Sequence, residues 1–384
     1  MTAKKSLDVW PALPLVVSGN VHRSIPKLKH SDRICEIHLS CNAFAYAKSV
    51  WKAMQVPFPE LVALRLSVPG WPNEPALPDS FLDGSAPRLR YLTLRLVMFP
   101  SLPKLLLSAT HLVHLDLHYI CPSKYISPEA MANCVTVLTS LEELHFNFQF
   151  SPDQESRRPL PPARSVLPAL TKLGFEGINE YFEDFVSRID TPRLYRLSII
   201  LSDDNDTPEL NQFISRTPRF GAYDEARLIF YNRAAQVRLQ SQSDHGMVEV
   251  QIICGKPDRQ LSCMAQICTL ALHPLLTMDN LYFEGDQLIP LLLSDGIENT
   301  NWLDLLLPFT AVKNLYLSKA FWPHIAPALQ ELTGGRTTEV LPALENVLLE
   351  GFQPSEAVQE GIGEFISARQ LINRPVAISA WDRG

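Results

Sequence analysis

The chain has 384 residues, of which 46% are hydrophobic and 20% charged, so it can bury a large core and is not intrinsically disordered. Its formal net charge of −7 argues against a nucleic-acid partner, because binding phosphates requires a basic face. The sequence contains no run of eighteen apolar residues, so it predicts neither a membrane span nor a membrane partner.

The cysteines and the first residues indicate a compartment. The seven cysteines are odd in number and contain no CxxC pair, which makes a disulfide framework improbable and favours a reducing environment. The apolar stretch after Lys5 is broken by Asp8, Pro11 and Pro14, so it does not form a signal peptide. The sequence therefore predicts a cytoplasmic or nuclear protein.

In chain order, residues 1–30 are predicted to cap a repeat array, with VWPALPLVV (9–17) as an edge strand. Residues 31–352 then repeat the pattern L-x-x-L-x-L about every 28 residues, which predicts about twelve leucine-rich repeats. The first apolar positions are Ile34, Leu61, Leu89, Leu112, Leu141, Leu170, Leu194, Tyr223, Met247, Met278, Val312 and Leu344.

The motif predicts how each repeat folds. Its last two apolar residues alternate along a short strand and so point to one face, and successive strands stack into a parallel sheet. Parallel pairing needs a long crossover, for which helices are expected at 126–140, 179–189 and 208–216. Ser127 is expected to cap the first of these, with Pro128 in its first turn. The predicted fold is an α/β leucine-rich-repeat solenoid (horseshoe) with a parallel concave sheet and a mostly helical convex side.

Two segments depart from this pattern, and a cap ends it. Residues 149–168 are rich in proline and charge, which predicts an exposed loop. Three strand-like runs lie too close together for helices within 225–253, which predicts a local antiparallel excursion. Residues 353–384 are predicted to form a C-terminal cap, made of a helix at 355–372 and a strand at 376–381.

The residues between the apolar positions should line the concave sheet face and bind a protein partner, since solenoids generally bind through such surfaces. A merely solvated sheet face is the alternative. Besides Glu36 and His38, the predicted partner-binding residues are Arg65, Tyr91, Thr93, Arg95, His114, Asp116, His118, Glu143, His145, Lys172, Glu176, Arg196, Asn280, Tyr282, Asn314 and Tyr316.

The run HLVHLDLH (111–118) also invites a metal interpretation. His114 and His118 would lie roughly 13 Å apart on one strand, too far to share an ion. A set of Asp116, His145 and one flanking histidine is conceivable, but polar residues of an exposed sheet face are favoured, so no metal and no cofactor are predicted. Cys263 and Cys268 are expected to be core or semi-buried thiols on a helix. Without a nucleophile–base pair or a GxSxG, Walker or GxGxxG motif, the chain is predicted not to be an enzyme.

Several segments resemble a known family, among them PFPELVALRL (57–66), LPDSFLDGSAPRLRYLTL (77–94), PFTAVKNLYLS (308–318) and ELTGGRTTEVLPALENVLLEG (331–351). They are similar to the C-terminal repeat region of the large F-box and leucine-rich-repeat-like family of mushroom-forming (basidiomycete) fungi. In that family an F-box docks the Skp-type adaptor of a cullin ubiquitin ligase, and the repeats select the substrate.

The resemblance implies a monomeric protein-recognition module that acts like the substrate receptor of a ubiquitin ligase. Only about thirty residues precede the first repeat, so the F-box itself is expected to be absent, and a Skp-type adaptor is expected only if a docking surface exists. The alternative is a truncated or degenerate structural repeat protein, a gene-model fragment without a ligase role.

Overall fold

The computed structural model describes residues 13–22, 30–68, 76–119, 126–148, 163–201, 208–221, 223–241, 246–270, 277–285, 298–332, 336–351 and 356–382. The chain forms two compact units, Met1–Pro192 (unit 1) and Arg193–Gly384 (unit 2). None of the helices in these ranges combines the length and the apolar character that crossing a membrane requires.

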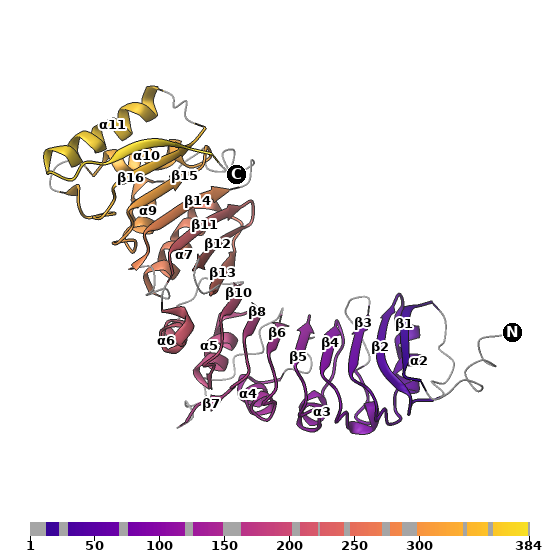
Figure 1. Ribbon diagram of the computed structural model, residues 1–384. Coiled ribbons are helices and arrows are strands. Elements are labelled where there is room, and N and C mark those ends of the chain that lie inside the picture. The colour runs from indigo at the N-terminus through magenta and orange to yellow at the C-terminus, as the bar shows by residue number, and fades with distance from the viewer. Residues whose placement is uncertain are drawn as a thin grey trace. The chain divides into compact units, whose positions relative to one another are not determined.

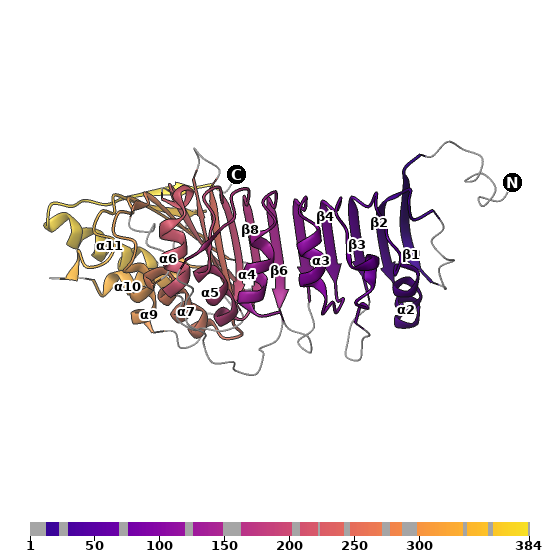
Figure 2. The same cartoon turned by 90° about the horizontal axis from the view of Figure 1, so that it is seen from below.

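Unit 1 is a parallel sheet with helices on one side (Figures 1 and 2). Successive strands pair in chain order, and β7 (Ser165–Val166) and β9 (Ile189–Asp190) form a small parallel pair of their own. The strands of the main sheet are β1 (Leu15–Val21), β2 (Ile34–Cys41), β3 (Ala63–Ser67), β4 (Tyr91–Arg95), β5 (His114–His118), β6 (Glu143–Phe148) and β8 (Lys172–Gly177). The connections contain α2 (Phe44–Ala53), η1 (Phe81–Gly84), α3 (Leu102–Ser108), α4 (Pro128–Thr136) and α5 (Asn179–Ser187).

The repeat motif builds the core of this unit. The second leucine of the motif pairs strand to strand, so that Leu64 lies beside Leu92 and Leu92 beside Leu115. The first motif position is equally buried, since Leu89 and Leu112 are both 0% exposed. Burying one such side chain stabilises the fold by about 1.5 to 3 kcal/mol. The α/β leucine-rich-repeat fold predicted from the sequence is therefore confirmed.

The predicted helices are also present, and their ends follow the expected chemistry. The Ser127 hydroxyl accepts a hydrogen bond from the Ala130 amide at 3.1 Å, so it caps α4 as expected, with Pro128 as the first helical residue. In α5, Phe182, Phe185 and Val186 are each 0% exposed, which gives this helix one apolar face. These faces pack the helices against the sheet.

Unit 2 is a mixed sheet, with strand order β10-β13-β12-β11-β14-β15-β16-β17. The strands are β10 (Arg196–Leu201), β11 (Glu225–Tyr231), β12 (Ala234–Gln240), β13 (Met247–Ile253), β14 (Asn280–Gly285), β15 (Asn314–Leu317), β16 (Asn346–Glu350) and β17 (Ala377–Trp381). The helical elements are α6 (Pro208–Arg216), η3 (Pro218–Phe220), α7 (Pro257–Leu270), α9 (Asn299–Leu306), α10 (Trp322–Gln330) and α11 (Glu356–Leu371).

The antiparallel excursion over 225–253 is confirmed, because β12 runs antiparallel to both β11 and β13. The predicted order of the repeats there is wrong. β13 pairs with β10 and β11 pairs with β14, so the repeat assigned to Met247 precedes the repeat assigned to Tyr223 in space. The motif phase is wrong as well, because Leu197 pairs with Val248 while Met247 is only half-buried.

Three further predictions concern the ends and the loop. Strand β1 begins at Leu15, later than expected for 9–17, because Pro14 has no N–H to donate to a neighbouring strand. The C-terminal helix and strand are present as α11 and β17, the latter parallel to β16. Of the predicted exposed loop at 149–168, residues 149–162 lie outside the described residues, as do residues 9–12 of the predicted edge strand. The end of this range is not an exposed loop, because Ser165–Val166 pair with β9 as strand β7 and Leu167 is 1% exposed.

The cysteines of the described ranges are free thiols, and Cys121 lies outside them. Cys263 and Cys268 are 4% and 2% exposed on α7, so they are core thiols as expected. Burial raises the pKa of the Cys268 thiol, which keeps it protonated and unreactive.

Candidate functional site

The predicted partner-binding residues all lie on strands, and they alternate with the buried motif positions. They therefore occupy the sheet face opposite the helices. Tyr91 is 45% exposed on this face, whereas Thr93 and Asp116 are buried, at 4% and 9% exposed. The structure brings most of these residues into a hollow, two polar groups, an asparagine row and an aromatic cluster. Arg95, Glu176 and Arg196 lie on the same face outside those groups.

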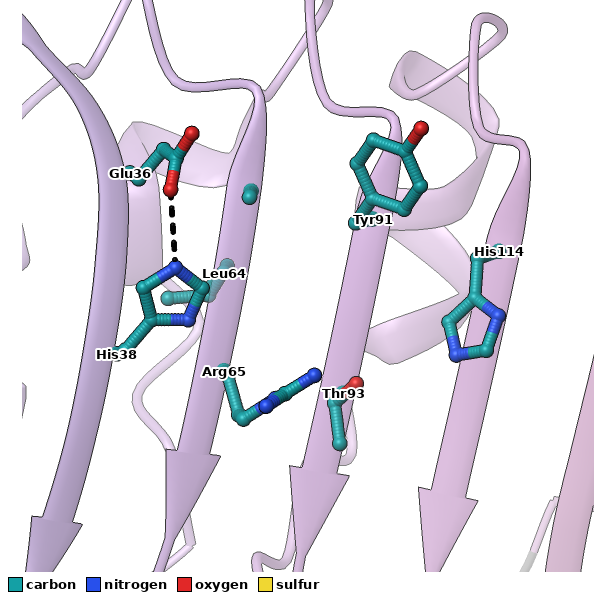
Figure 3. Close-up of a pocket in the computed structure, with 8 residues that line it drawn as sticks. Glu36, His38, Leu64, Arg65, Tyr91, Thr93 and His114 are labelled. Atoms are coloured by element: carbon teal, nitrogen blue, oxygen red, sulfur yellow. Dashed lines mark hydrogen bonds and ion pairs between the residues drawn. The ribbon is translucent and has the colours of Figure 1, made fainter.

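A shallow hollow of about 340 Å³ opens on the sheet face of unit 1 (Figure 3). Ala63 lies in register between Glu36 and Tyr91, and its small side chain leaves the space that forms the hollow. The His38 imidazole donates a hydrogen bond to the Glu36 carboxylate at 3.1 Å. The remaining lining residues are Leu64, Arg65, Thr93 and His114. The hollow could receive a partner side chain between an aromatic ring and charged groups of both signs.

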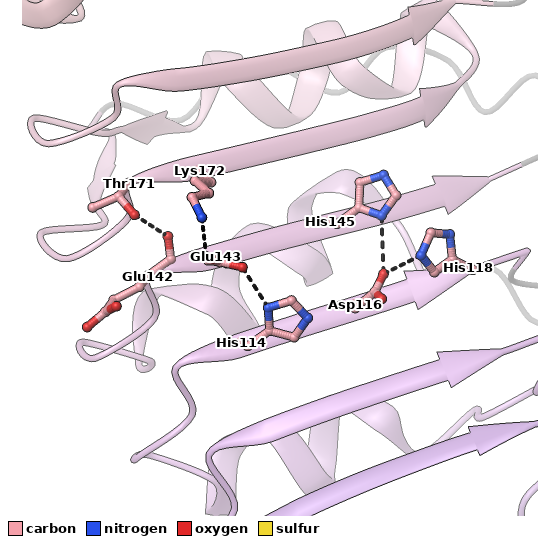
Figure 4. Close-up of polar contacts among 8 residues, drawn as sticks. All are labelled: His114, Asp116, His118, Glu142, Glu143, His145, Thr171 and Lys172. Carbon is pink, nitrogen blue, oxygen red and sulfur yellow. Dashed lines mark hydrogen bonds and ion pairs between the residues drawn. The ribbon is translucent and has the colours of Figure 1, made fainter. Parts of the chain in front are cut away.

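The first polar group joins β5, β6 and β8 (Figure 4). The Glu143 carboxylate accepts hydrogen bonds from His114 Nδ1 at 3.0 Å and from Lys172 Nζ at 2.6 Å. The bond from Lys172 holds the pKa of Glu143 below its usual range, against the opposing effect of burial. The side chains of His114, Glu143 and Lys172 are each about a third exposed. The first polar group therefore contributes little to the stability of the fold, and its side chains can form hydrogen bonds with a partner.

The second polar group, the histidine–aspartate cluster, consists of Asp116, His118 and His145. One carboxylate oxygen of Asp116, Oδ1, lies 2.6 Å from His118 Nε2 and 3.1 Å from His145 Nδ1. The two imidazole rings are 4.6 Å apart between centroids. Burial alone would raise the pKa of Asp116, but the hydrogen bonds and charges of the two histidines lower it well below its usual range. The Asp116 carboxylate is therefore ionised, and these three residues could hold a metal ion.

An asparagine row crosses β14, β15 and β16 in unit 2. The Asn314 amide donates to Asn280 Oδ1 at 2.9 Å, and the Asn346 amide donates to Asn314 Oδ1 at 2.8 Å. Each side chain thus satisfies its neighbour, and Asn280 itself donates to the Asp224 carbonyl at 3.3 Å. The row stabilises the register of these strands, which gives the predicted residues Asn280 and Asn314 a structural role.

The aromatic cluster of unit 2 consists of Arg227, Tyr282, Tyr316 and Trp381. The two tyrosine rings are stacked, with centroids 4.1 Å apart and an interplanar angle of 12°. The Arg227 guanidinium lies 4.4 Å from the Tyr282 ring centroid on the neighbouring strand, and Trp381 lies 5.4 Å from Tyr316. Arg227 also donates to Glu284 at 2.7 Å. The cluster is a preorganised platform of aromatic and guanidinium surface on the sheet face.

Sequence reasoning found Tyr282 and Tyr316 but missed Arg227 and Trp381. The signal for Arg227 was its place between the inward residues Ala226 and Leu228, which are both 0% exposed. Trp381 carries no local signal, because its ring reaches Tyr316 from β17, with β16 in between. Long side chains that cross a strand can be placed only from the folded sheet.

The titration of Tyr282 tests this geometry. Burial raises the pKa of Tyr282 to about 12, helped by Tyr316 and Glu225 and opposed by Arg227. An unfolded tyrosine has a pKa of about 10, so the stability that this proton provides is complete below about pH 10 and is lost as the pH rises through about 12. Tyrosinate absorbance of the wild type minus that of Tyr282→Phe should show Tyr282 still protonated at about pH 11. Tyr282 ionising near its ordinary pKa would contradict the packed cluster.

No protein-family model matches the chain, and no curated protein is similar to it in sequence. Among solved structures, the crystal structure of the leucine-rich repeat-containing protein LegL7 from Legionella pneumophila aligns with 96% of this chain and 91% of its own, at 10% identity and a TM-score of 0.33. The assignment to the leucine-rich-repeat class rests on the strand register and buried motif positions described above.

Proposed function

We propose that this chain is a non-enzymatic protein-recognition module that binds a protein partner through the strand face opposite its helices. The observation that carries this proposal is the aromatic cluster of Arg227, Tyr282, Tyr316 and Trp381. Arginine and large aromatic residues dominate the binding energy of protein interfaces, because aromatic rings offer a large contact area with few rotatable bonds and arginine offers several hydrogen-bond donors in one plane. Here they are already held in place by stacking and by the ion pairs of Arg227.

The first polar group of unit 1 supports the same function by offering exposed hydrogen-bonding groups. Glu143, His114 and Lys172 remain about a third exposed, so a partner can form hydrogen bonds with them without displacing buried groups. Exposed hydrogen-bonding groups of this kind are usual at the polar rim of a specific interface. Each unit could contribute its own contacts to one partner or bind a separate one.

The finer proposal is a substrate-receptor-like role, as in the F-box/leucine-rich-repeat subunits of cullin ubiquitin ligases, in the cytoplasm or the nucleus. Its support is the sequence resemblance to the basidiomycete F-box family and, for the compartment, the free thiols of the described cysteines. The alternative is a structural repeat protein with no ligase role. The fold is common to both, so only binding experiments separate them.

The decisive experiment is affinity purification of the tagged 384-residue chain, with the wild type compared with a Tyr282→Ala/Tyr316→Ala double variant. A true partner should be retained by the wild type and lost from the double variant. With that partner purified, the double variant should raise Kd at least about 30-fold, the effect of losing about 2 kcal/mol at a hot spot.

Leu307→Ser is the matched control, because Leu307 is 45% exposed at the C-terminal end of α9, a helix of the same unit as Tyr282 and Tyr316. It should leave partner retention unchanged. Equal retention by the wild type and the double variant would contradict the proposed surface. Purified Skp-type adaptor, tested separately for binding to the chain, addresses only the finer proposal: no binding would rule out the ligase role and leave the recognition module standing.

A further inference from the structure

We propose that Asp116, His118 and His145 form a binding site for a Zn²⁺ ion. Each residue offers one ligand atom, and the three atoms lie within 4.8 Å of one another. Zinc in proteins binds imidazole nitrogens and carboxylate oxygens at about 2.0 to 2.2 Å, so its ligand atoms must converge within a few ångströms of each other. The histidine–aspartate cluster meets that requirement within the main sheet of unit 1.

The sheet brings the ligands together from two strands. Asp116 and His118 are two residues apart on β5, so their side chains project from the same face. His145 lies on β6 in direct register with Asp116. Because this register is fixed by the paired motif residues on either side, Leu115 with Leu144 and Leu117 with Phe146, the three ligands are held by the strands of the repeat rather than by a loop.

Gly174 completes the arrangement. It is paired with His145 across β6 and β8, and a Cβ atom at this position would lie 2.2 Å from His145 Cδ2. The imidazole therefore occupies the space that any other side chain at 174 would take. This placement directs Nδ1 of His145 toward Asp116, and the second nitrogen of the ring points away (Figure 4). The absence of a side chain at 174 is what permits this orientation.

The donor set selects the class of metal. Two imidazole nitrogens and one carboxylate oxygen suit zinc, whereas Ca²⁺ and Mg²⁺ prefer sites built from oxygen alone. Zinc has no geometric preference from its d electrons, so it tolerates ligands held at the spacing of a sheet. Three protein ligands leave a fourth position open to water or to another molecule, as in zinc sites that are not purely structural.

The contacts of the Asp116 carboxylate within the cluster suit a bound cation. The Asp116 side chain is only 12% exposed, and its Oδ1 faces an imidazole nitrogen of each histidine at hydrogen-bond distance. Each of these contacts needs a proton on the facing nitrogen. Zinc would instead bind the lone pairs of these two nitrogens and the carboxylate, with each imidazole carrying its proton on its other ring nitrogen. The polar-surface interpretation favoured from the sequence assumed exposed residues, but Asp116 is buried.

The test is isothermal titration calorimetry of the full chain with Zn²⁺, after removal of bound metal with a chelator. The wild type should bind one zinc ion per chain, and His118→Asn and His145→Asn should each weaken binding at least about tenfold. Co²⁺ offers an independent readout, because its visible absorption spectrum reports nitrogen and oxygen ligation without requiring any activity. Circular dichroism should show that the variants remain folded.

Two further variants make the result specific. His114→Asn is the matched control: His114 is on the same strand and face but bonds to Glu143, so this variant should bind zinc like the wild type. Gly174→Ala keeps all three ligands but turns the His145 ring, so it should weaken zinc binding at least about tenfold. A wild type that binds no zinc, or equal affinity of the wild type and His118→Asn, would overturn the site. Neither outcome bears on the proposed recognition of a protein partner.

Discussion

Replacing Phe146 with alanine is expected to lower the free energy of unfolding of unit 1 by about 3 to 5 kcal/mol. Phe146 is 0% exposed and stands at the centre of an aromatic core. Its ring centroid lies 5.0 Å from Phe185, 5.3 Å from Phe148, 5.4 Å from Phe175 and 5.9 Å from Tyr181. Truncation would leave a cavity that rings on β6, β8 and α5 cannot all move to fill.

The change can be measured by urea denaturation, followed by hydrogen exchange of the β6 amides to assign the loss to unit 1. Tyr91→Ala is the matched control, because Tyr91 is an aromatic residue of the same sheet but is 45% exposed. It should cost far less than the core substitution. Equal losses for the two variants would show that the aromatic residues around Phe146 do not form a close-packed core.

Replacing Arg369 with methionine is expected to destabilise unit 2 by about 3 to 5 kcal/mol, since it leaves several buried acceptors without a donor. Arg369 on α11 is 0% exposed, and its guanidinium donates to main-chain carbonyls of the segment that precedes β16. Burial lowers the pKa of Arg369, which shows the cost of holding this charge inside. Methionine keeps the apolar stem, so the loss would come from the hydrogen bonds. The accepting carbonyls belong to Thr337, Leu341, Pro342 and Leu344.

Arg374→Met is the matched control for this experiment. Arg374 also donates to the Pro342 carbonyl, at 2.9 Å, but it does so from the surface. Its loss should therefore cost no more than about 1 kcal/mol, because water can replace the donor. Thermal and denaturant unfolding of both variants decide the matter, and similar midpoints for the two would contradict the structural role assigned to Arg369.

Much of the fold followed from sequence because the repeat is local. The spacing of Leu89, Leu92 and Leu94 predicts one strand, and the same spacing elsewhere predicts its neighbours. The error at Met247 has a physical cause. A shift of two residues keeps every side chain of a strand on the same face, so alternation alone cannot distinguish Val248 from Val250 as the second position of the motif. The hairpins that reverse the strand order leave no trace in that alternation.

The candidate site was predictable to a different extent. Alternation placed His114, Asp116 and His145 on one face, but it could not say which carboxylate would face which imidazole. That depends on the register of β5 with β6, which is fixed by pairing between residues far apart in sequence. The burial of Asp116 was likewise invisible, because it arises from the neighbouring side chains rather than from its own position.

The inverted order of β11, β12 and β13 has a consequence for how the protein is synthesised and how it could have grown. In an ordinary repeat array each strand meets its neighbour as soon as the next repeat leaves the ribosome. Here Arg196 on β10 acquires its partner Met247 only after β11 and β12 have been made, and β11 then waits for β14. Assembly from the N-terminus must therefore pause at β10 until the whole three-stranded insert has emerged. The same three strands also limit how the array could have grown by duplication of single repeats. Strands β11, β12 and β13 pair with one another, so copying only one of them would break this pairing, and the three must be gained or lost together.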